Sequence, residues 1–277
     1  GDDKKIKKNP ERELLNLYVK FCKEEKLSLE QELAKSPDQE DREVYLENEW
    51  TKKAKNALQK LESNDKELII LWKKIKEYSL KGFFDIYKIL DIKFDEIIGQ
   101  SKFSDEGKRL VKEAIKKNIA IIGKDNEVIA KIEPLPDKVI LRSDGTALYS
   151  TQDIGAALSR YYKYKFDKMI YVTGSEQTLY FQQIFKILEK LNFRWAKNMI
   201  HLPFGLISLE EGKMSTREGK VIFLQEVIDK SKELALKEIE DKNPKLKNKE
   251  EIAEKVGISA LKYFILKLEP IRYINFS

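Results

Sequence analysis

Apolar positions in the first ~110 residues recur every three to four residues, the spacing that places them on one face of a helix. A helix is predicted to begin at Pro10, and Leu14, Leu17 and Phe21 share its apolar face. Two further helices are predicted: 36–60, opened by a Ser-Pro-Asp cap at 36–38, and 64–90, capped by Asn64. Most polar positions in these helices are charged, which is typical of solvated helix faces.

From residue 119 onwards, short apolar runs alternate with helical patterns. Two runs flank the Lys-Asp-Asn sequence at 124–126, which predicts a β-hairpin over 119–132. The strands or extended segments predicted after it are 139–142, 146–149, 169–174 and 201–209. The predicted helices are 152–165, 176–191, 224–239 and about 248–268. Alternating strands and helices indicate an α/β fold, with a parallel sheet covered by helices.

This change of pattern predicts two regions, 1–110 and 111–277. The first is largely helical, and the second carries the α/β pattern. No segment rich in Pro, Gly and Ser separates them, so the boundary near residue 110 is loose.

The composition favours a globular protein without a membrane partner. Hydrophobic residues make up 42% of the chain, and no apolar run approaches the ~20 residues that span a bilayer. Cys22 is the only cysteine and His201 the only histidine. A single cysteine excludes an internal disulfide and favours the cytoplasm. One cysteine and one histidine are too few for a Cys/His metal site.

The net charge of +6 is unevenly distributed. Residues 1–110 are balanced, and the excess of Lys and Arg lies in 111–277. A basic region of this kind suggests a polyanionic partner such as nucleotide phosphates or nucleic acid.

Two strand-to-helix turns of the predicted sheet carry polar residues that could bind a ligand. In LYSTQDIG, Tyr149 is predicted at a strand end and Asp153 in the first turn of the next helix. In VTGSEQ, Gly174 leaves the strand, and Glu176 and Gln177 enter a helix. Ligands of parallel α/β sheets bind beyond the carboxyl ends of the strands, so we expect these residues on one sheet edge.

Each of these residues also has a purely structural interpretation. First-turn acids such as Asp153 and Glu176 routinely favour the helix dipole. Tyr149 fits a core aromatic with a solvated tip, and Gly174 fits a tight turn. Their predicted convergence at one edge favours a binding site.

The stretch GKMSTREGKVI, residues 212–222, places three cations and two hydroxyls between apolar segments. It has the composition of a phosphate-binding loop but not the P-loop spacing, which requires Gly, four residues and Gly-Lys-Ser/Thr. Here six residues separate Gly212 from Gly219, and Val221 follows Lys220. We therefore expect this stretch to form a third part of the binding site, and we do not expect a P-loop NTPase. The structural alternative is that the stretch is a solvated hairpin tip.

GKMSTREGK resembles the Lys-Met-Ser-Lys-Ser loop of class I aminoacyl-tRNA synthetases. The stretch from VILRSDGTALYSTQDIGAA through VTGSEQTLYFQQIFKILEKL to FGLISLEEGKMSTREGKVIFL is similar to the arginyl-tRNA synthetases. The resemblance runs from about residue 10 to the end and is sharpest over 139–224.

The resemblance implies the second half of a Rossmann-like catalytic domain, which activates arginine with ATP and transfers it to tRNA(Arg). Region 1–110 would be a helical insertion or connective region. Tyr149, Asp153 and Gln177 fall on positions that hold arginine in the family, and a carboxylate can meet a guanidinium with two parallel hydrogen bonds. Gly174 and Glu176 would lie beside the nucleotide ribose.

The resemblance also assigns roles to the loop. Lys213, Ser215 and Arg217 would be catalytic and stabilise charge on the ATP phosphates as pyrophosphate leaves. Lys213 and Met214 would contact ATP. Mg²⁺ is expected to accompany ATP without a protein metal site, and a monomer is expected.

Several features depart from the family pattern. The family's His-x-Gly-His motif cannot be present with a single histidine, and the chain ends before the anticodon-binding helical bundle. We therefore expect a fragment of a longer synthetase that is inactive by itself. Gln152, Tyr180 and Gln100 stand where the family usually has Arg, His and Glu. The alternative hypothesis is a non-catalytic, synthetase-like module that binds a nucleotide or a protein.

Overall fold

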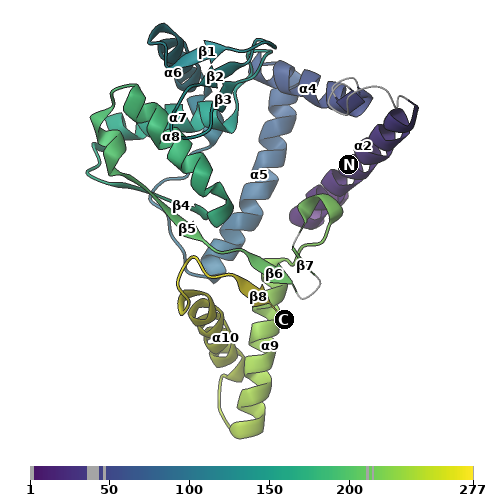
Figure 1. The fold of residues 1–277 in the computed structure, drawn as a ribbon. Coiled ribbons are helices and arrows are strands. Elements are labelled where there is room, and N and C mark those ends of the chain that lie inside the picture. The colour runs from purple at the N-terminus through teal and green to yellow at the C-terminus, as the bar shows by residue number, and fades with distance from the viewer. Residues whose placement is uncertain (1–2, 36–43, 46–47, 210–211, 214, 277) are drawn as a thin grey trace. The chain divides into compact units, whose positions relative to one another are not determined.

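The computed structural model describes residues 3–35, 44–45, 48–209, 212–213 and 215–276. The chain divides into two compact units, and Figure 1 shows its helices and strands. The helical unit contains 1–94, 208–268 and 275–277, and the α/β unit contains 95–207 and 269–274. The predicted domains 1–110 and 111–277 differ from these units, because residues from both parts of the chain share the helical unit's core.

The helical unit is built from long helices. They are α1 (Asp3–Lys8), α2 (Pro10–Lys35), α4 (Glu49–Glu62), α5 (Lys66–Ile89), α9 (Leu224–Lys242) and α10 (Lys249–Leu266). α9 and α10 lie side by side as an antiparallel pair (Figure 1). Leu90, Ile228 and Leu261 form a small buried core between α5, α9 and α10. In the part of the chain that the structure describes, no helix is both long and apolar enough to cross a bilayer.

Side-chain caps determine where α4 and α5 begin. The Asn48 carboxamide oxygen accepts hydrogen bonds from the amides of Trp50 and Thr51, at 3.0 and 3.3 Å. The Asp65 carboxylate accepts one from the Leu68 amide at 3.0 Å. The predicted cap of α5 was one residue early, because Asn64 adopts a left-handed conformation in the preceding turn. The predicted cap at 36–38 lies outside the described residues.

The α/β unit has the larger core. Its helices are the 3-10 helix η1 (Gln100–Phe103), α6 (Ser104–Lys116), α7 (Tyr149–Tyr164), the 3-10 helix η2 (Ser175–Gln177), α8 (Thr178–Lys190) and the 3-10 helix η3 (Arg194–Asn198). Leu110, Ile154, Leu158 and Ile187 from α6, α7 and α8 are fully buried in one cluster with Ile140 of a neighbouring strand.

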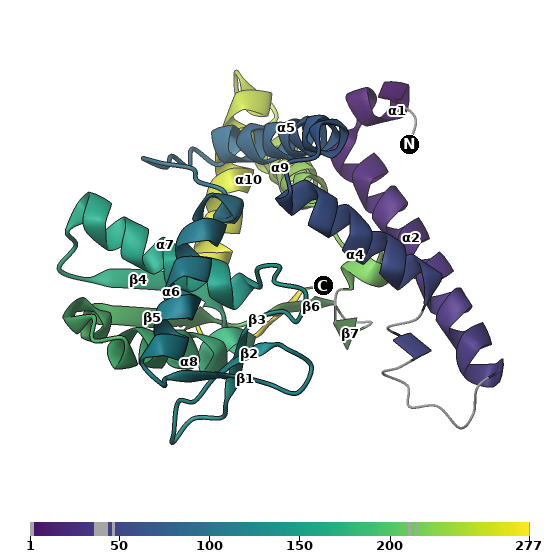
Figure 2. The ribbon, with the colours of Figure 1, turned by 90° about the horizontal axis from the view of Figure 1, so that it is seen from above.

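Two sheets belong to this unit. β1 (Ala120–Ile122), β2 (Val128–Ala130) and β3 (Lys138–Leu141) form an antiparallel sheet in that order, which confirms the predicted hairpin. β4 (Met169–Gly174) and β5 (Met199–Phe204) pair in parallel from Met169 opposite Met199 to Gly174 opposite Phe204 (Figure 2). The parallel pairing follows from the crossover through α8.

One face of the β4–β5 pair is apolar and exposed. Alternate residues of a strand point to opposite faces. On one face, Tyr171 contacts the ring of Phe181 from α8. The other face exposes the following side chains by 41–61%: Ile170, Val172, Ile200, Leu202 and Phe204.

The strand predicted over 146–149 is not formed. The Asp144 carboxylate accepts hydrogen bonds from the amide and hydroxyl of Thr146, at 2.9 and 2.7 Å. Gly145 adopts a φ of 77° in the same turn, and α7 begins at Tyr149. The turn therefore leads directly into the helix, and Tyr149 is a helix residue and not a strand end.

The remaining strands are short. β6 (Ile207–Leu209) pairs antiparallel with β7 (Gly212–Lys213), with Ser208 opposite Lys213. β8 is Ile274–Phe276, and the Ile274 amide donates to the Leu206 carbonyl at 3.0 Å.

Candidate functional site

Asp153 of α7 is the most constrained polar residue of the predicted site. Its side chain belongs to the α/β unit and is only 8% exposed. The Gln100 carboxamide donates a hydrogen bond to Oδ1 at 2.7 Å, and the Tyr180 hydroxyl donates one to Oδ2 at 2.5 Å. Residues from η1, α7 and α8 thus meet at one carboxylate.

The start of α7 is fastened to β3 by two hydroxyls. The Ser150 hydroxyl donates to the Val139 carbonyl at 3.0 Å, and the Thr151 hydroxyl donates to the Ile140 carbonyl. The Thr151 oxygen also accepts the Leu148 amide at 2.9 Å, which satisfies a helix-terminal donor. Buried hydroxyls that are fully bonded fix the rotation of α7, and this directs Asp153 inwards.

Two glycines bring α6 and α7 into close contact. A Cβ on Gly155 would lie 2.5 Å from the Phe103 carbonyl oxygen, and one on Gly107 would lie 2.0 Å from the Thr151 carbonyl oxygen. Neither position has room for a side chain. This close approach carries η1, and with it Gln100, towards Asp153.

Tyr180 lies in a buried aromatic cluster at the start of α8. Its ring packs edge-to-face on Phe181 at 5.2 Å between ring centroids, and Lys138 Nζ lies 4.8 Å from the Tyr180 ring centroid. Burial, and then the charge of Asp153, raise the pKa of the Tyr180 hydroxyl well above its usual value. Burial also raises the pKa of Tyr171 to about 12; the charge of Arg160 opposes this shift, and the charge of Asp153 adds a smaller raising effect. Tyr180 is therefore a protonated donor towards Asp153.

Tyr149, Glu176 and Gln177, which are also predicted to bind arginine or ribose, are more accessible. Tyr149 is 72% exposed at the first position of α7. Gly174 ends β4, and the exposed Glu176 and Gln177 form η2 directly before α8. A Cβ on Gly174 would meet only Leu206 Cδ2, at 3.7 Å, so packing within the chain does not require a glycine here. Gly174 itself is buried.

The predicted phosphate loop belongs to the helical unit. Ser215 and Lys220 form an antiparallel bridge, with hydrogen bonds of 2.9 and 3.0 Å between their backbones. The 3-10 helix η4 (Thr216–Glu218) lies between them, and Gly219 closes the turn with a φ of 75°. The Lys220 ammonium lies 2.9 Å from the Glu218 carboxylate and lowers its pKa.

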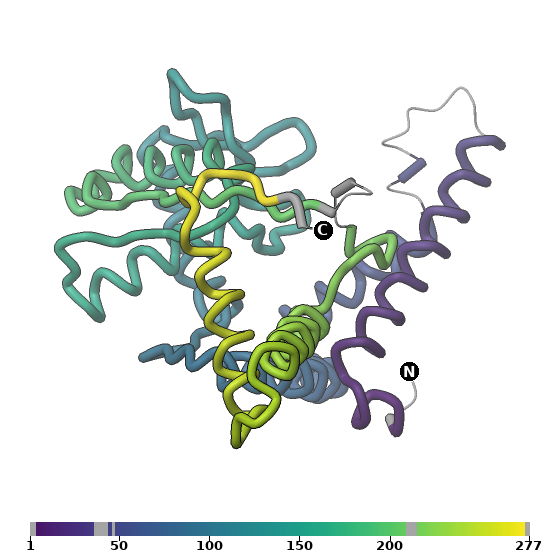
Figure 3. Tube along the Cα trace, turned by 90° about the horizontal axis from the view of Figure 1, so that it is seen from below, coloured from purple at the N-terminus to yellow at the C-terminus, as the bar shows by residue number. Residues whose placement is uncertain are grey.

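The loop cations occupy different places. Arg217 is exposed on η4, and Lys213 lies in β7. Met214 lies outside the described residues. The loop lies beside α2 (Figure 3). Val19 Cγ2 of α2 would be 3.4 Å from a Cβ on Gly219.

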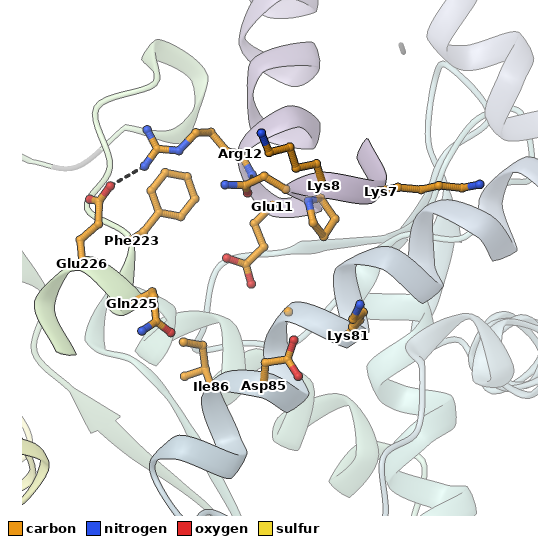
Figure 4. A pocket seen from close by; sticks show the side chains of 13 residues that line it. Lys7, Lys8, Glu11, Arg12, Lys81, Asp85, Ile86, Phe223, Gln225 and Glu226 are labelled. Carbon is orange, nitrogen blue, oxygen red and sulfur yellow. Dashed lines mark hydrogen bonds and ion pairs between the residues drawn. The ribbon is translucent and has the colours of Figure 1, made fainter. Parts of the chain in front are cut away.

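A cavity of about 320 Å³ lies where the segment after this loop meets the first turn of α2. The Arg12 guanidinium lies 4.9 Å from the Phe223 ring centroid and forms an ion pair with Glu226 (Figure 4). The cavity is lined by both basic and acidic side chains, for example Lys81 and Asp85. It contains none of the predicted substrate-binding residues. Across the described ranges, no group of three or more His, Cys, Asp or Glu side chains could hold a metal ion.

The structure corrects the expected arrangement on one sheet edge. β3, which precedes α7, belongs to an antiparallel sheet, β4 to the parallel pair, and β7 to a third pairing. Asp153 and the β4–α8 turn approach each other through α7 and α8, not along a sheet. The sequence also gave no sign that Gln100 and Tyr180 contact Asp153, because 53 and 27 residues separate them from it.

Comparison with known proteins identifies the family. The model of the catalytic domain of class I (R) tRNA synthetases matches residues 10–277. The arginine–tRNA ligase of Halothermothrix orenii is 42% identical over 262 residues, which cover 94% of this chain and 43% of that protein. The ligase of Clostridium perfringens is 37% identical over 277 residues, which cover 100% of this chain and 46% of that protein. The chain thus spans less than half the length of these curated relatives.

Solved structures agree on the fold. The arginyl-tRNA synthetase of Plasmodium falciparum matches with a TM-score of 0.70 and 24% identity, over 86% of this chain and 41% of that one. The Thermus thermophilus arginyl-tRNA synthetase matches with a TM-score of 0.62 and 18% identity, over 94% of this chain and 50% of that one. The predicted class I synthetase fold, with its parallel strands, is confirmed. The chain belongs to the family of class I arginyl-tRNA synthetase catalytic domains.

Proposed function

We propose that this chain supplies the second half of the catalytic domain of an arginine–tRNA ligase, which forms arginyl-adenylate from arginine and ATP and then charges tRNA(Arg). Family membership supports the reaction, and one observation supports the substrate. Asp153 is a buried carboxylate whose two oxygens are held only by neutral donors in the described part of the chain. A buried charge of this kind needs a cationic partner.

Arginine supplies such a partner. Its guanidinium presents N–H donors in a fixed fork, which can form two parallel hydrogen bonds with the Asp153 carboxylate. Tyr149 and Gln177, at the starts of α7 and η2–α8, are proposed to complete the arginine site. The exposure of Tyr149 gives its ring access to a ligand.

ATP is proposed to bind at the β4–α8 turn and at the loop of the helical unit. Gly174 allows the ribose to approach the backbone, and the Glu176 carboxylate can accept hydrogen bonds from ribose hydroxyls. Lys213, Ser215 and Arg217 contact the triphosphate, and Met214 contacts ATP. Mg²⁺ arrives with ATP as part of the substrate.

In the proposed reaction, the arginine carboxylate attacks the α-phosphorus of ATP, and pyrophosphate leaves. Negative charge develops on the β- and γ-phosphates, where Lys213 and Arg217 stabilise it. A ribose hydroxyl at the tRNA end then attacks the activated carbonyl carbon, and AMP leaves. A tRNA partner and the single Cys22 support a cytoplasmic location for this reaction.

A chimera tests the proposal. This chain replaces the matching region of the Halothermothrix orenii ligase, and arginine-dependent ATP–pyrophosphate exchange and tRNA charging are measured against the unmodified relative. We expect exchange by the chimera and none above background by the 277-residue chain alone, since preorganised donors are divided between the two parts. A folded chimera that binds neither arginine nor ATP would contradict the proposal. Binding without exchange would indicate the non-catalytic module instead.

A further inference from the structure

The hydrogen bonds at Asp153 leave its charge uncompensated. Each carboxylate oxygen has two lone pairs, and Gln100 and Tyr180 use one on each oxygen. Both donors are neutral, so they fix the orientation of the carboxylate without neutralising it. One lone pair on each oxygen remains, which is the number that a forked guanidinium requires.

Two cations beside the surrounding tyrosines, Lys138 and Arg160, contact aromatic rings. Lys138 Nζ lies over the Tyr180 ring, and the Arg160 guanidinium lies 5.8 Å from the Tyr171 ring centroid. Arg160 also donates to the Tyr171 hydroxyl at 3.4 Å. No lysine or arginine among the described residues forms an ion pair with Asp153.

The fold, and not a flexible loop, holds both donors. Gln100 lies in η1, which continues into α6, and the Gln152 carboxamide of α7 donates to Ser104 Oγ of α6 at 3.1 Å. Tyr180 lies in the first turn of α8, with its ring packed on Phe181. A donor on a packed element cannot follow a carboxylate that rotates, so each donor restrains Asp153.

We propose that Gln100 and Tyr180 are positioning residues that orient the Asp153 carboxylate for a guanidinium and, by being neutral, reserve its charge for that substrate. The inference rests on the proposed function and adds to it the residues that determine selectivity for a cationic side chain. Citrulline, which has a neutral urea in place of the guanidinium, should bind far more weakly. The selectivity should depend on both donors.

The test uses the chimera with the Halothermothrix orenii ligase described above, with arginine and citrulline titrated by calorimetry. Tyr180→Phe removes one hydroxyl, and Gln100→Met removes the other donor at similar length. Tyr162→Phe, which alters an exposed tyrosine of α7, is the control. Each test variant should weaken arginine binding about tenfold, because a carboxylate that is free to rotate must be ordered to meet both arms of the guanidinium fork. Citrulline affinity should change much less.

The ratio of the arginine affinity to the citrulline affinity separates a positioning role from a general loss of structure. A folded Tyr180→Phe or Gln100→Met variant with the wild-type ratio overturns the inference and leaves the proposed function intact. If Tyr180→Phe does not fold, Gln100→Met tests the same claim at the other oxygen. A folded chimera without these substitutions that binds no arginine overturns the proposed site, and with it the substrate named here.

A ligand-independent measurement tests the restraint itself. In protein labelled at tyrosine Cζ, the Tyr180 resonance should show a protonated hydroxyl near pH 10, where exposed tyrosines ionise. Asp153→Asn should shift its titration to lower pH, because the carboxylate charge raises the Tyr180 pKa. A Tyr180 resonance that titrates with the exposed tyrosines in the wild type contradicts the hydrogen bond.

Discussion

Replacing Asp153 by asparagine removes one negative charge from the α/β unit and keeps the shape of the side chain. In the native protein, Oδ1 accepts a hydrogen bond from Gln100 and Oδ2 accepts one from Tyr180. In the variant, the amide oxygen can keep the Gln100 bond. The amide NH₂ can donate to the Tyr180 oxygen, because a phenol both donates and accepts. Both hydrogen bonds are kept, although donor and acceptor are exchanged in the bond with Tyr180. The free energy of unfolding should therefore change by about 1 kcal/mol or less.

Arginine binding should suffer much more. A hydrogen bond to a charged group contributes about 1.5–3 kcal/mol and a neutral one about 0.5–1.5 kcal/mol. The amide oxygen of the variant can accept one guanidinium N–H without charge assistance, and the amide NH₂ can accept none, so the second bond is lost. The loss is therefore roughly 2 kcal/mol or more, at least about 30-fold in Kd.

Calorimetric titration of the chimera with arginine measures the Kd, and a thermal melt of the 277-residue chain measures stability. Asp167→Asn is the matched control, because Asp167 is an exposed acid just beyond α7. It should change neither quantity. An unchanged arginine Kd together with a lowered Tm for Asp153→Asn would refute the reasoning. Asp153 would then be a structural residue that favours the helix terminus.

Three further substitutions test packing, the nucleotide site and the loop. Gly155→Ala should lower the free energy of unfolding by about 1–3 kcal/mol, because its Cβ would lie 2.5 Å from the Phe103 carbonyl oxygen. If chemical denaturation gives the wild-type free energy of unfolding, the close packing is contradicted. Gly174→Ala should leave Tm unchanged, since its Cβ meets only Leu206 at 3.7 Å, yet weaken ATP binding severalfold; unchanged ATP affinity removes Gly174 from the nucleotide site. In the chimera, Lys213→Ala should lower kcat for exchange by roughly 10²-fold with a much smaller change in KM for ATP. A raised KM with kcat intact would mean that the loop is a static phosphate cradle.

Features that depend on local sequence were predicted well. Pro10 opens α2, the hairpin over 119–132 forms, and β4 spans the predicted residues. Periodicity and turn residues are properties of short segments, so they can be read without knowledge of the fold. The same holds for Asp153, whose place early in a helix after a turn was visible in the sequence.

Features that depend on contacts between distant segments were not predicted. The short run at 146–149 has strand propensity, but the Asp144 side chain closes a turn there and the helix starts instead. The partners of Asp153 come from η1 and α8, and no sequence pattern connects Gln100 with Tyr180. The close approach of Gly107 and Gly155 is also invisible in one sequence, because a glycine in a helix has no single meaning.

The parallel pair β4–β5 makes backbone amides a direct measure of how complete the sheet is. In a parallel ladder, alternate residues of a strand direct both backbone groups to the same neighbour, and the residues between them direct theirs to the other side. With two strands in the described sheet, amides along β4 should alternate between slow and fast exchange with solvent deuterium. A further strand added beside β4 would slow the fast set and leave the slow set unchanged. Residue-resolved exchange would therefore show on which side the sheet grows.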